Sequence, residues 1–318
     1  MLTRPEFQAL LQRKDTLILD GALATELEVR GYNLNHPLWS GKILKEYPEV
    51  IQQIHLDYYL AGADIAITAS YQASTQGFLD HFELKETDAK ELIKRSVRLA
   101  QHARFEAVQS GLLSANIELL IAGSVGPYGA YLSDGSEYRG DYMRSSEEFK
   151  GFHRPRIEAL VDAGVDILAI ETMPSMPEII AVLEILSTDF PDAVSWISCT
   201  LKDPEHLSDG TLIREVKDLV ERSNQVVAFG VNCIPIELVT PFIQHMAPSK
   251  IPILCYPNSG EIWDAEAKTW HGGNRTIKMF GSQAIEWRAA GASLIGGCCR
   301  TGPKDIEDIL QSLRVNRS

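Results

Sequence analysis

Three cysteines follow two apolar runs of the sequence, and their residue type suits them to hold a metal ion. Cys233 ends the run Val231-Asn232-Cys233, and the pair Cys298-Cys299 follows Gly296-Gly297. Two glycines before a vicinal pair let the backbone bend enough for both sulfurs to face one point. Three thiolates on one Zn²⁺ leave the fourth tetrahedral position open, as in catalytic rather than structural zinc sites. A soft, sulfur-rich ligand set also favours zinc over magnesium or calcium.

The alternative is that these three thiols are structural, because free cysteine is often buried and no CxxC pair is present. Five cysteines is an odd number, and their spacing is not that of a secreted disulfide framework. Cys255 lies inside an apolar run and is expected to be part of the core. Cys199 stands near the end of another run, and we favour a structural role for it as well.

Short β-rich runs alternate with longer amphipathic stretches along the whole chain. In Pro48–Leu60, for example, Ile51, Ile54 and Tyr58 fall on one helical face. The runs are apolar at successive positions, as expected of strands that are buried on both faces. The eight predicted strands are Thr16–Asp20, Ile65–Thr68, Leu119–Gly123, Ile167–Glu171, Ser195–Thr200, Val226–Cys233, Ile253–Tyr256 and Leu294–Gly297.

A small repeat separates helical stretches from strands at three places: Ala61-Gly62-Ala63-Asp64, Ala163-Gly164-Val165-Asp166 and Ala290-Gly291-Ala292-Ser293. Each glycine suits the left-handed position just after a helix. Eight strands alternating with helices favour an α/β fold, a single (β/α)8 TIM barrel over residues 1–318 with zinc at the C-terminal rim of the strands. A doubly wound sheet stays open, since alternation alone does not show closure.

In a barrel, the residues at the ends of the strands converge on one rim, where active sites are built. A long loop, Tyr128–Asp141, is expected to lie over this rim. The rim residues are unusually polar and rich in thiols: Asp20, Thr68, Ser124, Glu171, Cys199 or Thr200, Asn232, Cys233, Tyr256, Cys298 and Cys299.

The bulk properties exclude some classes of partner. A net charge of −13 argues against nucleic acid, whose phosphates would be repelled, and is compatible with a cationic substrate. No segment approaches the roughly 18 apolar residues that span a bilayer, and Arg13, Lys14 and Asp15 interrupt the region where a signal peptide would be apolar. We therefore expect a cytoplasmic protein with small-molecule substrates and neither nucleic acid nor membrane as partner. We take it to be a monomer, an expectation that does not follow from these properties.

The sequence resembles the homocysteine S-methyltransferase family over nearly its whole length. The resemblance rests on Asp20-Gly21-Ala22 with Thr25-Glu26-Leu27, Thr68-Ala69-Ser70-Tyr71, Gly123-Ser124-Val125-Gly126-Pro127, Glu171-Thr172, Val231-Asn232-Cys233 and Gly296-Gly297-Cys298-Cys299-Arg300. The similarity is greatest to the branch that uses S-methylmethionine or S-adenosylmethionine. It is suggested by Tyr138-Arg139-Gly140-Asp141-Tyr142, His153-Arg154-Pro155-Arg156 and Tyr256-Pro257-Asn258-Ser259-Gly260.

The resemblance implies that the three cysteines bind Zn²⁺ and that the sulfur of homocysteine takes the open position. It assigns Asp20 and Glu171 to the amino group of homocysteine, and it places Thr68 near that amino acid. Asn232 is expected to lie beside the substrate or to steady the Cys233 loop. Asp20 could instead cap a helix beginning near Ala22, and Glu171 could form a salt bridge at the rim.

The implied reaction is zinc-dependent methyl transfer from a sulfonium donor to the thiolate of L-homocysteine, giving methionine. A betaine- or selenocysteine-type methyltransferase, a zinc hydrolase on the same barrel and a non-catalytic amino-acid-binding protein stay open as alternatives. None of the eight histidines falls in a recognisable ligand motif, which weighs against the hydrolase. A sulfonium is attracted to aromatic faces, and the candidates are Tyr71, Tyr128, Tyr131, Tyr138, Trp263 and Trp270.

Overall fold

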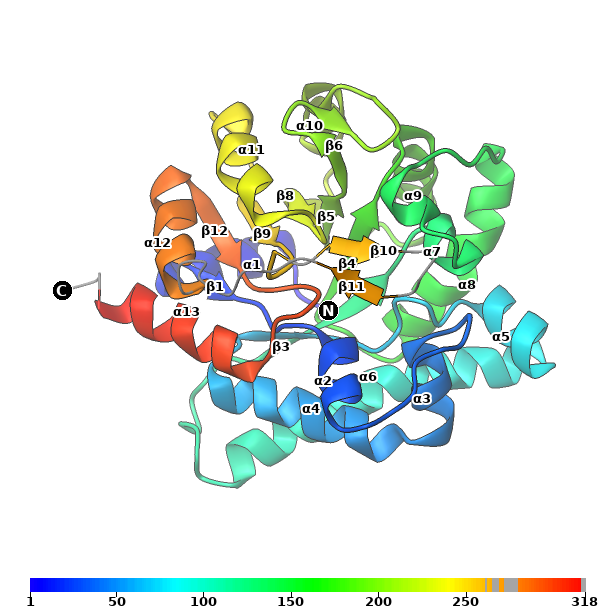
Figure 1. Cartoon of the computed structure of the whole chain (residues 1–318), viewed down its shortest axis with the longest axis horizontal. Coiled ribbons are helices and arrows are strands. Elements are labelled where there is room, and N and C mark those ends of the chain that lie inside the picture. The colour runs from blue at the N-terminus through cyan, green and yellow to red at the C-terminus, as the bar shows by residue number, and fades with distance from the viewer. Residues whose placement is uncertain (261, 265–268, 272–279, 316–318) are drawn as a thin grey trace.

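Eight parallel strands form a ring that helices surround (Figure 1). The computed structural model describes residues 1–260, 262–264, 269–271 and 280–315. Neighbouring strands follow the order β1-β12-β9-β8-β5-β4-β3-β2. Their bounds are β1 Leu17–Ile18, β2 Ile65–Ile67, β3 Leu120–Val125, β4 Ile167–Met173, β5 Ser195–Cys199, β8 Val226–Asn232, β9 Ile253–Tyr256 and β12 Ala292–Ile295.

The ring is closed between its first and last strands. Leu19, just after β1, forms a parallel bridge with Ile65 of β2. The Asp20 amide donates to the Ile65 carbonyl at 3.0 Å, and the Asp64 amide donates to the Ile18 carbonyl at 2.7 Å. A doubly wound sheet would leave these two edges unpaired. The barrel prediction is confirmed, and each of the eight predicted strands overlaps an observed one.

Helices fill most connections and pack on the outside of the barrel. They are α1 Arg4–Lys14, α2 Leu23–Val29, α3 Ser40–Glu46, α4 Pro48–Ala61, α5 Thr75–Phe82, α6 Glu86–Gln109, α7 Tyr128–Leu132, α8 Ser146–Asp162, α9 Met176–Asp189, α10 Ile213–Val220, α11 Val239–Met246, α12 Phe280–Ala290 and α13 Pro303–Val315. The 3₁₀ helices are η1 Ser136–Tyr138 and η2 Ile236–Leu238, and two small hairpins pair β6 Leu201–Asp203 with β7 His206–Leu207 and β10 Ile262–Asp264 with β11 Thr269–His271.

The continuous apolar character of the strands reflects two separate cores. Leu17 and Leu19 pack in the cluster that fills the barrel interior, whereas Ile18 between them packs outward against the helices. Since neighbouring side chains of a strand point to opposite faces, both sets of positions must be apolar. Phe7 and Leu10 of α1 belong to the interior cluster, so α1 covers one end of the barrel.

The repeated turns adopt the predicted backbone. Gly62, Gly164 and Gly291 have φ values of 106°, 82° and 119°, which favour glycine. The aspartates of the first two repeats have a further role that the sequence did not suggest. Asp64 Oδ2 accepts from the Ile18 amide at 2.9 Å, and Asp166 Oδ2 accepts from the Ile121 amide at 2.8 Å. Each turn therefore ties the start of its own strand to the preceding strand of the barrel.

The connection Tyr128–Asp141 was expected to be a long loop, and this is wrong in part. It contains the short helix α7 and the 3₁₀ turn η1. Gly129 allows the two to pack closely, because a Cβ there would lie 2.6 Å from the Glu137 amide nitrogen. The segment nevertheless borders the rim, as predicted, because Ser133, Gly135, Glu137 and Tyr138 line the pocket described below.

We expect Gly230→Ala to destabilise the barrel by roughly 3 kcal/mol, near the upper end of the usual overpacking cost. A Cβ on Gly230 of β8 would lie 1.7 Å from the Leu254 carbonyl oxygen of neighbouring β9. Gly151→Ala is the matched control, because this exposed glycine of α8 has no atom within 4 Å of the added Cβ. The control should gain about 0.5–1 kcal/mol from better helix propensity. Urea unfolding midpoints measure both, and equal midpoints would contradict the packing argument.

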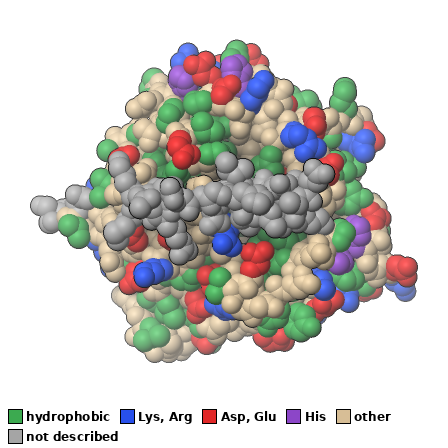
Figure 2. Space-filling model, viewed as in Figure 1, with side chains coloured by type: hydrophobic (Ala, Val, Ile, Leu, Met, Phe, Trp, Pro, Cys, Tyr) green, Lys and Arg blue, Asp and Glu red, His purple; other side chains and the backbone are tan. Residues whose placement is uncertain are grey.

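Acidic and basic side chains are interspersed on the face that Figure 2 shows, with hydrophobic side chains scattered between them. Among the helices of the described residues, none is both long enough and apolar enough to cross a membrane.

Candidate metal and substrate site

A pocket of about 780 Å³ opens at the carboxyl ends of the barrel strands. Of the predicted rim positions, only Cys199 and Thr200 are missing from its walls. The rim residues that line it are Asp20, Thr68, Ser124, Glu171, Asn232, Cys233, Tyr256, Cys298 and Cys299. The strand ends therefore converge as a closed barrel requires.

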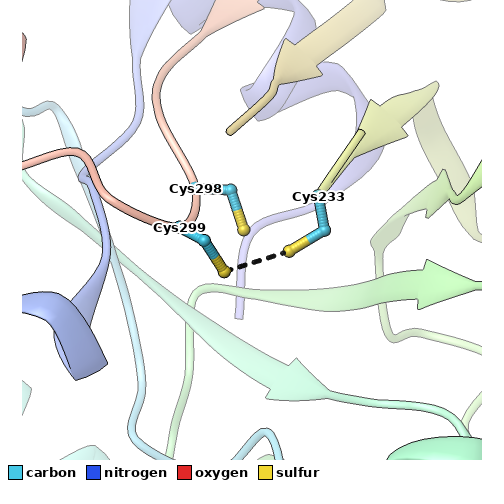
Figure 3. Close-up of side chains that lie close together, drawn as sticks. All are labelled: Cys233, Cys298 and Cys299. Carbon is cyan, nitrogen blue, oxygen red and sulfur yellow. Dashed lines mark hydrogen bonds between the residues drawn. The ribbon is translucent and has the colours of Figure 1, made fainter. Parts of the chain in front are cut away.

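Cys233, Cys298 and Cys299 point their sulfurs at a common point (Figure 3). Their Sγ atoms all lie within 4.8 Å of one another, and those of Cys233 and Cys299 are 3.7 Å apart. Tetrahedral zinc with Zn–S bonds of about 2.3 Å requires sulfurs about 3.8 Å apart. The spacing and the donor type of this group therefore fit a zinc ion. In the part of the chain that the structure describes, it is the one group with metal-ligand geometry.

The backbone around the thiols is held in an unusual conformation. Cys233 has φ 52°, and Arg300, next to the vicinal pair, has φ 67°. Non-glycine residues avoid this region at a cost of about 1–2 kcal/mol each. Hydrogen bonds hold these turns in place: the Cys298 amide donates to the Pro257 carbonyl at 2.8 Å, and the Arg300 amide donates to Thr25 Oγ1 at 3.0 Å.

The two glycines before the vicinal pair are needed for a reason other than the predicted one. Neither Gly296 nor Gly297 has a positive φ. Instead, a Cβ on Gly296 would lie 2.6 Å from the Leu19 Cβ, and one on Gly297 would lie 2.3 Å from Thr301 Oγ1. The glycines thus let the chain pass close to β1 and the start of the C-terminal helix, rather than allowing a sharp bend.

Of the three thiols, that of Cys298 loses its proton most easily. Hydrogen bonds from the Cys233 and Cys299 thiols lower the pKa of Cys298 well below its usual range. The pKa values of Cys233 and Cys299 are raised well above it, through their interaction with the Cys298 thiolate and through burial. Cys199 and Cys255 are fully buried outside this group, and burial raises the pKa of both, so the core position predicted for Cys255 is confirmed.

Asp20 and Glu171 lie buried beside the thiols. Asp20 Oδ2 accepts from the Ile67 amide at 2.8 Å, and helix α2 has no side-chain cap, so the helix-cap alternative for Asp20 is wrong. Glu171 accepts hydrogen bonds from Ser124 Oγ and, at 3.2 Å, from the Tyr256 hydroxyl. Burial raises the pKa of Asp20 well above its usual range and that of Glu171 to about 7. Two such carboxyls in one pocket favour a cationic ligand.

Asn232 uses its side chain within the protein. Its Oδ1 accepts from the Thr172 amide and from Ser198 Oγ, both at 2.7 Å, and its Nδ2 donates to Thr172 Oγ1 at 2.8 Å. Thr172 has φ 62°, an unfavourable value for a β-branched residue. These contacts support the prediction that Asn232 steadies the Cys233 loop. They join Asn232, which precedes Cys233, to Thr172, which follows Glu171.

Thr68 lines the pocket, but its hydroxyl is engaged in joining two strands. Its Oγ1 accepts from the Ser124 amide at 3.0 Å and pairs with Ser70 Oγ at 2.7 Å. The same interactions position Ser124, which donates to Glu171. A direct contact between Thr68 and a substrate stays a prediction.

The chain is similar to proteins of one known family over nearly its whole length. The sequence model of the homocysteine S-methyltransferase family matches residues 17–313. The chain belongs to this family. It is 54% identical over 304 residues to a homocysteine S-methyltransferase of Escherichia coli, covering 94% of this chain and 96% of that protein. A Bacillus subtilis homocysteine S-methyltransferase, YbgG, is 46% identical over 305 residues, with 95% and 96% coverage.

A crystal structure of one family member has the same fold as this chain. The crystal structure of the E. coli homocysteine methyltransferase MmuM in its metallated form superimposes with a TM-score of 0.86 at 50% identity, over 97% of this chain and 99% of that chain. The three cysteines thus lie together at the carboxyl ends of the barrel strands, where the strand-end prediction placed them.

The aromatic candidates for a sulfonium group divide into two sets. Tyr71 and Tyr138 line the pocket. Tyr128 and Tyr131 do not; their rings pack 5.4 Å apart, in a separate aromatic cluster. The side chains of Trp263 and Trp270 lie outside what the structure describes.

Sequence reasoning missed one wall of the pocket altogether. Residues 32–37, 39 and 40, between α2 and the start of α3, contribute Tyr32, His36 and Trp39 to the lining. The helices on either side have only seven residues each, too few for the apolar periodicity that marked the larger elements. The sole hint was the clustering of aromatic and polar residues directly after the Asp20 motif.

Proposed function

We propose that this chain transfers a methyl group from a sulfonium donor, S-methylmethionine or S-adenosylmethionine, to the sulfur of L-homocysteine, giving methionine. The observation that carries the proposal is the convergence of three thiols, spaced for tetrahedral zinc, with two buried carboxyls in one pocket. Membership of the homocysteine S-methyltransferase family supports it.

Cys233, Cys298 and Cys299 would hold the zinc ion. Bound there, zinc would keep homocysteine as a thiolate at neutral pH, where a free thiol with a pKa near 8.5 is mostly protonated. Zn²⁺ held by three cysteine thiolates would have a net charge of about −1 and would be a weak Lewis acid, so it would leave electron density on the substrate sulfur.

The chain's own residues would bind and orient the two reactants. Asp20 and Glu171 receive the ammonium of homocysteine, and Ser124 and Tyr256 hold Glu171 in place. The substrate sulfur attacks the methyl carbon, the bond from that carbon to the donor sulfur breaks, and its electron pair stays on the leaving thioether. No proton is transferred in this step, so the main requirement is alignment of the three atoms, which supplies about 7–11 kcal/mol in favourable cases.

A zinc hydrolase is less well supported by this site. Among the residues described, the metal-binding group contains neither histidine nor carboxylate, the ligands that hydrolytic zinc sites ordinarily include. We also propose that the barrel forms one domain over residues 1–318, that the protein is a cytoplasmic monomer, and that its partners are the two small substrates.

A donor screen tests the function. The zinc-supplied protein is incubated with homocysteine and either S-methylmethionine, S-adenosylmethionine or betaine, and methionine is measured. We expect methionine with one or both sulfonium donors and little with betaine. Methionine from betaine alone, or from no donor at all, would refute the proposed donor class. Less than about a tenth of an equivalent of zinc after preparation with zinc supplied and without chelator would refute the metal.

A further inference from the structure

The pocket extends well beyond the residues assigned to homocysteine and zinc, and its lining is acidic. Four carboxylates face it, Asp20, Glu28, Glu137 and Glu171, and the described lining residues include no lysine or arginine. Asp20 and Glu171 are hydrogen-bonded beside the thiols, and Glu28 lies 3.6 Å from the Arg300 guanidinium. Glu137 is the remaining carboxylate, and it has no role in the proposed binding of homocysteine.

One carboxylate oxygen of Glu137, Oε2, is buried, and no described residue forms a hydrogen bond with it. Burial raises the pKa of Glu137 to about 7. The backbone at this residue is fixed, since Thr200 Oγ1 donates to the Glu137 carbonyl at 2.9 Å. Leaving a buried acceptor unsatisfied is unfavourable, and a ligand with an N–H group would satisfy it.

Two tyrosines, Tyr71 and Tyr138, line the pocket together with Glu137 and the three thiols. Burial raises the pKa of Tyr71, and negative charge on Glu137 and on the thiol group raises it further. Burial likewise raises the pKa of Tyr138, and negative charge on the thiol group and on Glu137 raises it further. A molecule bound at Glu137 would lie along these tyrosines with its other end near the reacting sulfur.

We propose that Glu137 binds the primary ammonium group of the methyl donor, with the sulfonium of the donor against Tyr71 and Tyr138. This inference rests on the proposed function and deepens it. Glu137 Oε2 requires a hydrogen-bond donor. A sulfonium has no N–H to offer and is held instead by aromatic faces. The residue therefore selects donors built on an α-amino acid and discriminates against betaine, whose quaternary nitrogen carries no hydrogen.

The test compares two donors and two variants in the zinc-loaded full-length protein. The donors are S-methylmethionine and N-acetyl-S-methylmethionine, which keeps the sulfonium but lacks the ammonium. Glu137→Gln should raise the KM for S-methylmethionine about 10- to 100-fold, the usual effect of losing a charged hydrogen-bond partner. The KM for homocysteine should change less than about twofold. Wild-type protein should strongly prefer S-methylmethionine, and Glu137→Gln should largely lose that preference.

Asp141→Asn is the matched control. It removes the same charge from the same connection, but Asp141 is exposed and ion-paired with Arg139 at 2.8 Å, outside the pocket lining. Its donor KM should equal that of the wild type. Calorimetric titration of S-methylmethionine into the zinc-loaded protein without homocysteine gives a second readout, in which Glu137→Gln should weaken binding by a similar factor.

The two possible failures are distinguishable. If wild-type protein forms methionine but Glu137→Gln leaves both the donor KM and the donor preference unchanged, the role of Glu137 is wrong and the function stands. The role of Glu137 is also wrong if the variant raises the KM for homocysteine rather than that for the donor. If wild-type protein forms no methionine from S-methylmethionine or S-adenosylmethionine, the proposed function is wrong and the inference falls with it.

Discussion

Replacing Cys298 with serine should remove bound zinc and methyl transfer together while the barrel stays folded. Serine has nearly the same shape, but its hydroxyl does not ionise near neutral pH, so the site would lose one of three thiolate ligands. Cys298 is only half-buried at the pocket, so the substitution creates no core cavity. Zinc should fall below about a tenth of an equivalent, and turnover should fall roughly a thousandfold or more, because the homocysteine thiolate would be neither formed nor positioned.

Cys255→Ala is the control for the loss of a cysteine as such. Cys255 is fully buried in β9 and outside the metal-binding group, so this variant should keep its zinc and its turnover. It should lose about 1 kcal/mol of stability through the small cavity left by the sulfur. Elemental analysis, methionine formation and circular dichroism distinguish the two variants. Full activity in metal-depleted Cys298→Ser would contradict the assignment of this thiol to the metal.

Most of the fold could be predicted because its requirements are local. Strands inside a (β/α)8 barrel are buried on both faces, so each gives an uninterrupted apolar run that is easy to recognise. The repeat glycines at 62, 164 and 291 marked the turns before three strands, and all three have the left-handed backbone. Closure could not be predicted in this way, because it depends on the Leu19–Ile65 bridge and the backbone hydrogen bonds beside it, which join residues far apart in the sequence.

In the candidate site, the residues that could be predicted are those whose type alone implies a chemical role. Three cysteines at strand ends have few other uses together, and the barrel brings them within 4.8 Å. Residues whose role depends on their partners could not be assigned. Asn232 forms hydrogen bonds with Thr172, and Glu137 Oε2 has no hydrogen-bond partner among the described residues. Both facts depend on how side chains from distant segments lie relative to one another. No pattern of residue types along the chain encodes such contacts.

The same contacts show that Glu171 and the strand that ends at Cys233 are one connected unit. Glu171 accepts from Tyr256, whose hydroxyl pairs with Ser198 Oγ at 2.6 Å. Ser198 in turn donates to Asn232, the residue before Cys233. A change at Glu171 would therefore disturb the thiol strand if it left these partners unsatisfied. This argues for testing Glu171 with an isosteric substitution rather than with alanine, which would leave Ser124 and Tyr256 without their acceptor.

Glu171→Gln should raise the KM for homocysteine about 10- to 100-fold while zinc content stays near that of the wild type. The amide keeps the shape of the side chain and an acceptor for Ser124 or Tyr256, but loses the charge that attracts an ammonium, which is worth about 1.5–3 kcal/mol. Zinc content measured on the same preparations separates this result from damage to the metal site. An unchanged KM for homocysteine would show that Glu171 does not bind its amino group.

The pH dependence should identify Glu171 as one of the titrating groups. Burial raises its pKa to about 7, so the carboxylate that binds the ammonium is lost as the pH falls through this value. Without zinc, one ionised thiol among the three gives a net charge of about −1. Zn²⁺ bound by three thiolates has the same net charge, so metal binding leaves the charge near Glu171 similar. Between pH 8 and pH 6, ionisation of Glu171 should contribute about a tenfold fall in kcat/KM for homocysteine in wild type. In Glu171→Gln the total fall should be smaller by about this factor. The fall that remains comes from the homocysteine thiol, which loses its proton on binding zinc, and from Asp20, whose pKa burial also raises; falls of equal size in both proteins would assign the titration to another group.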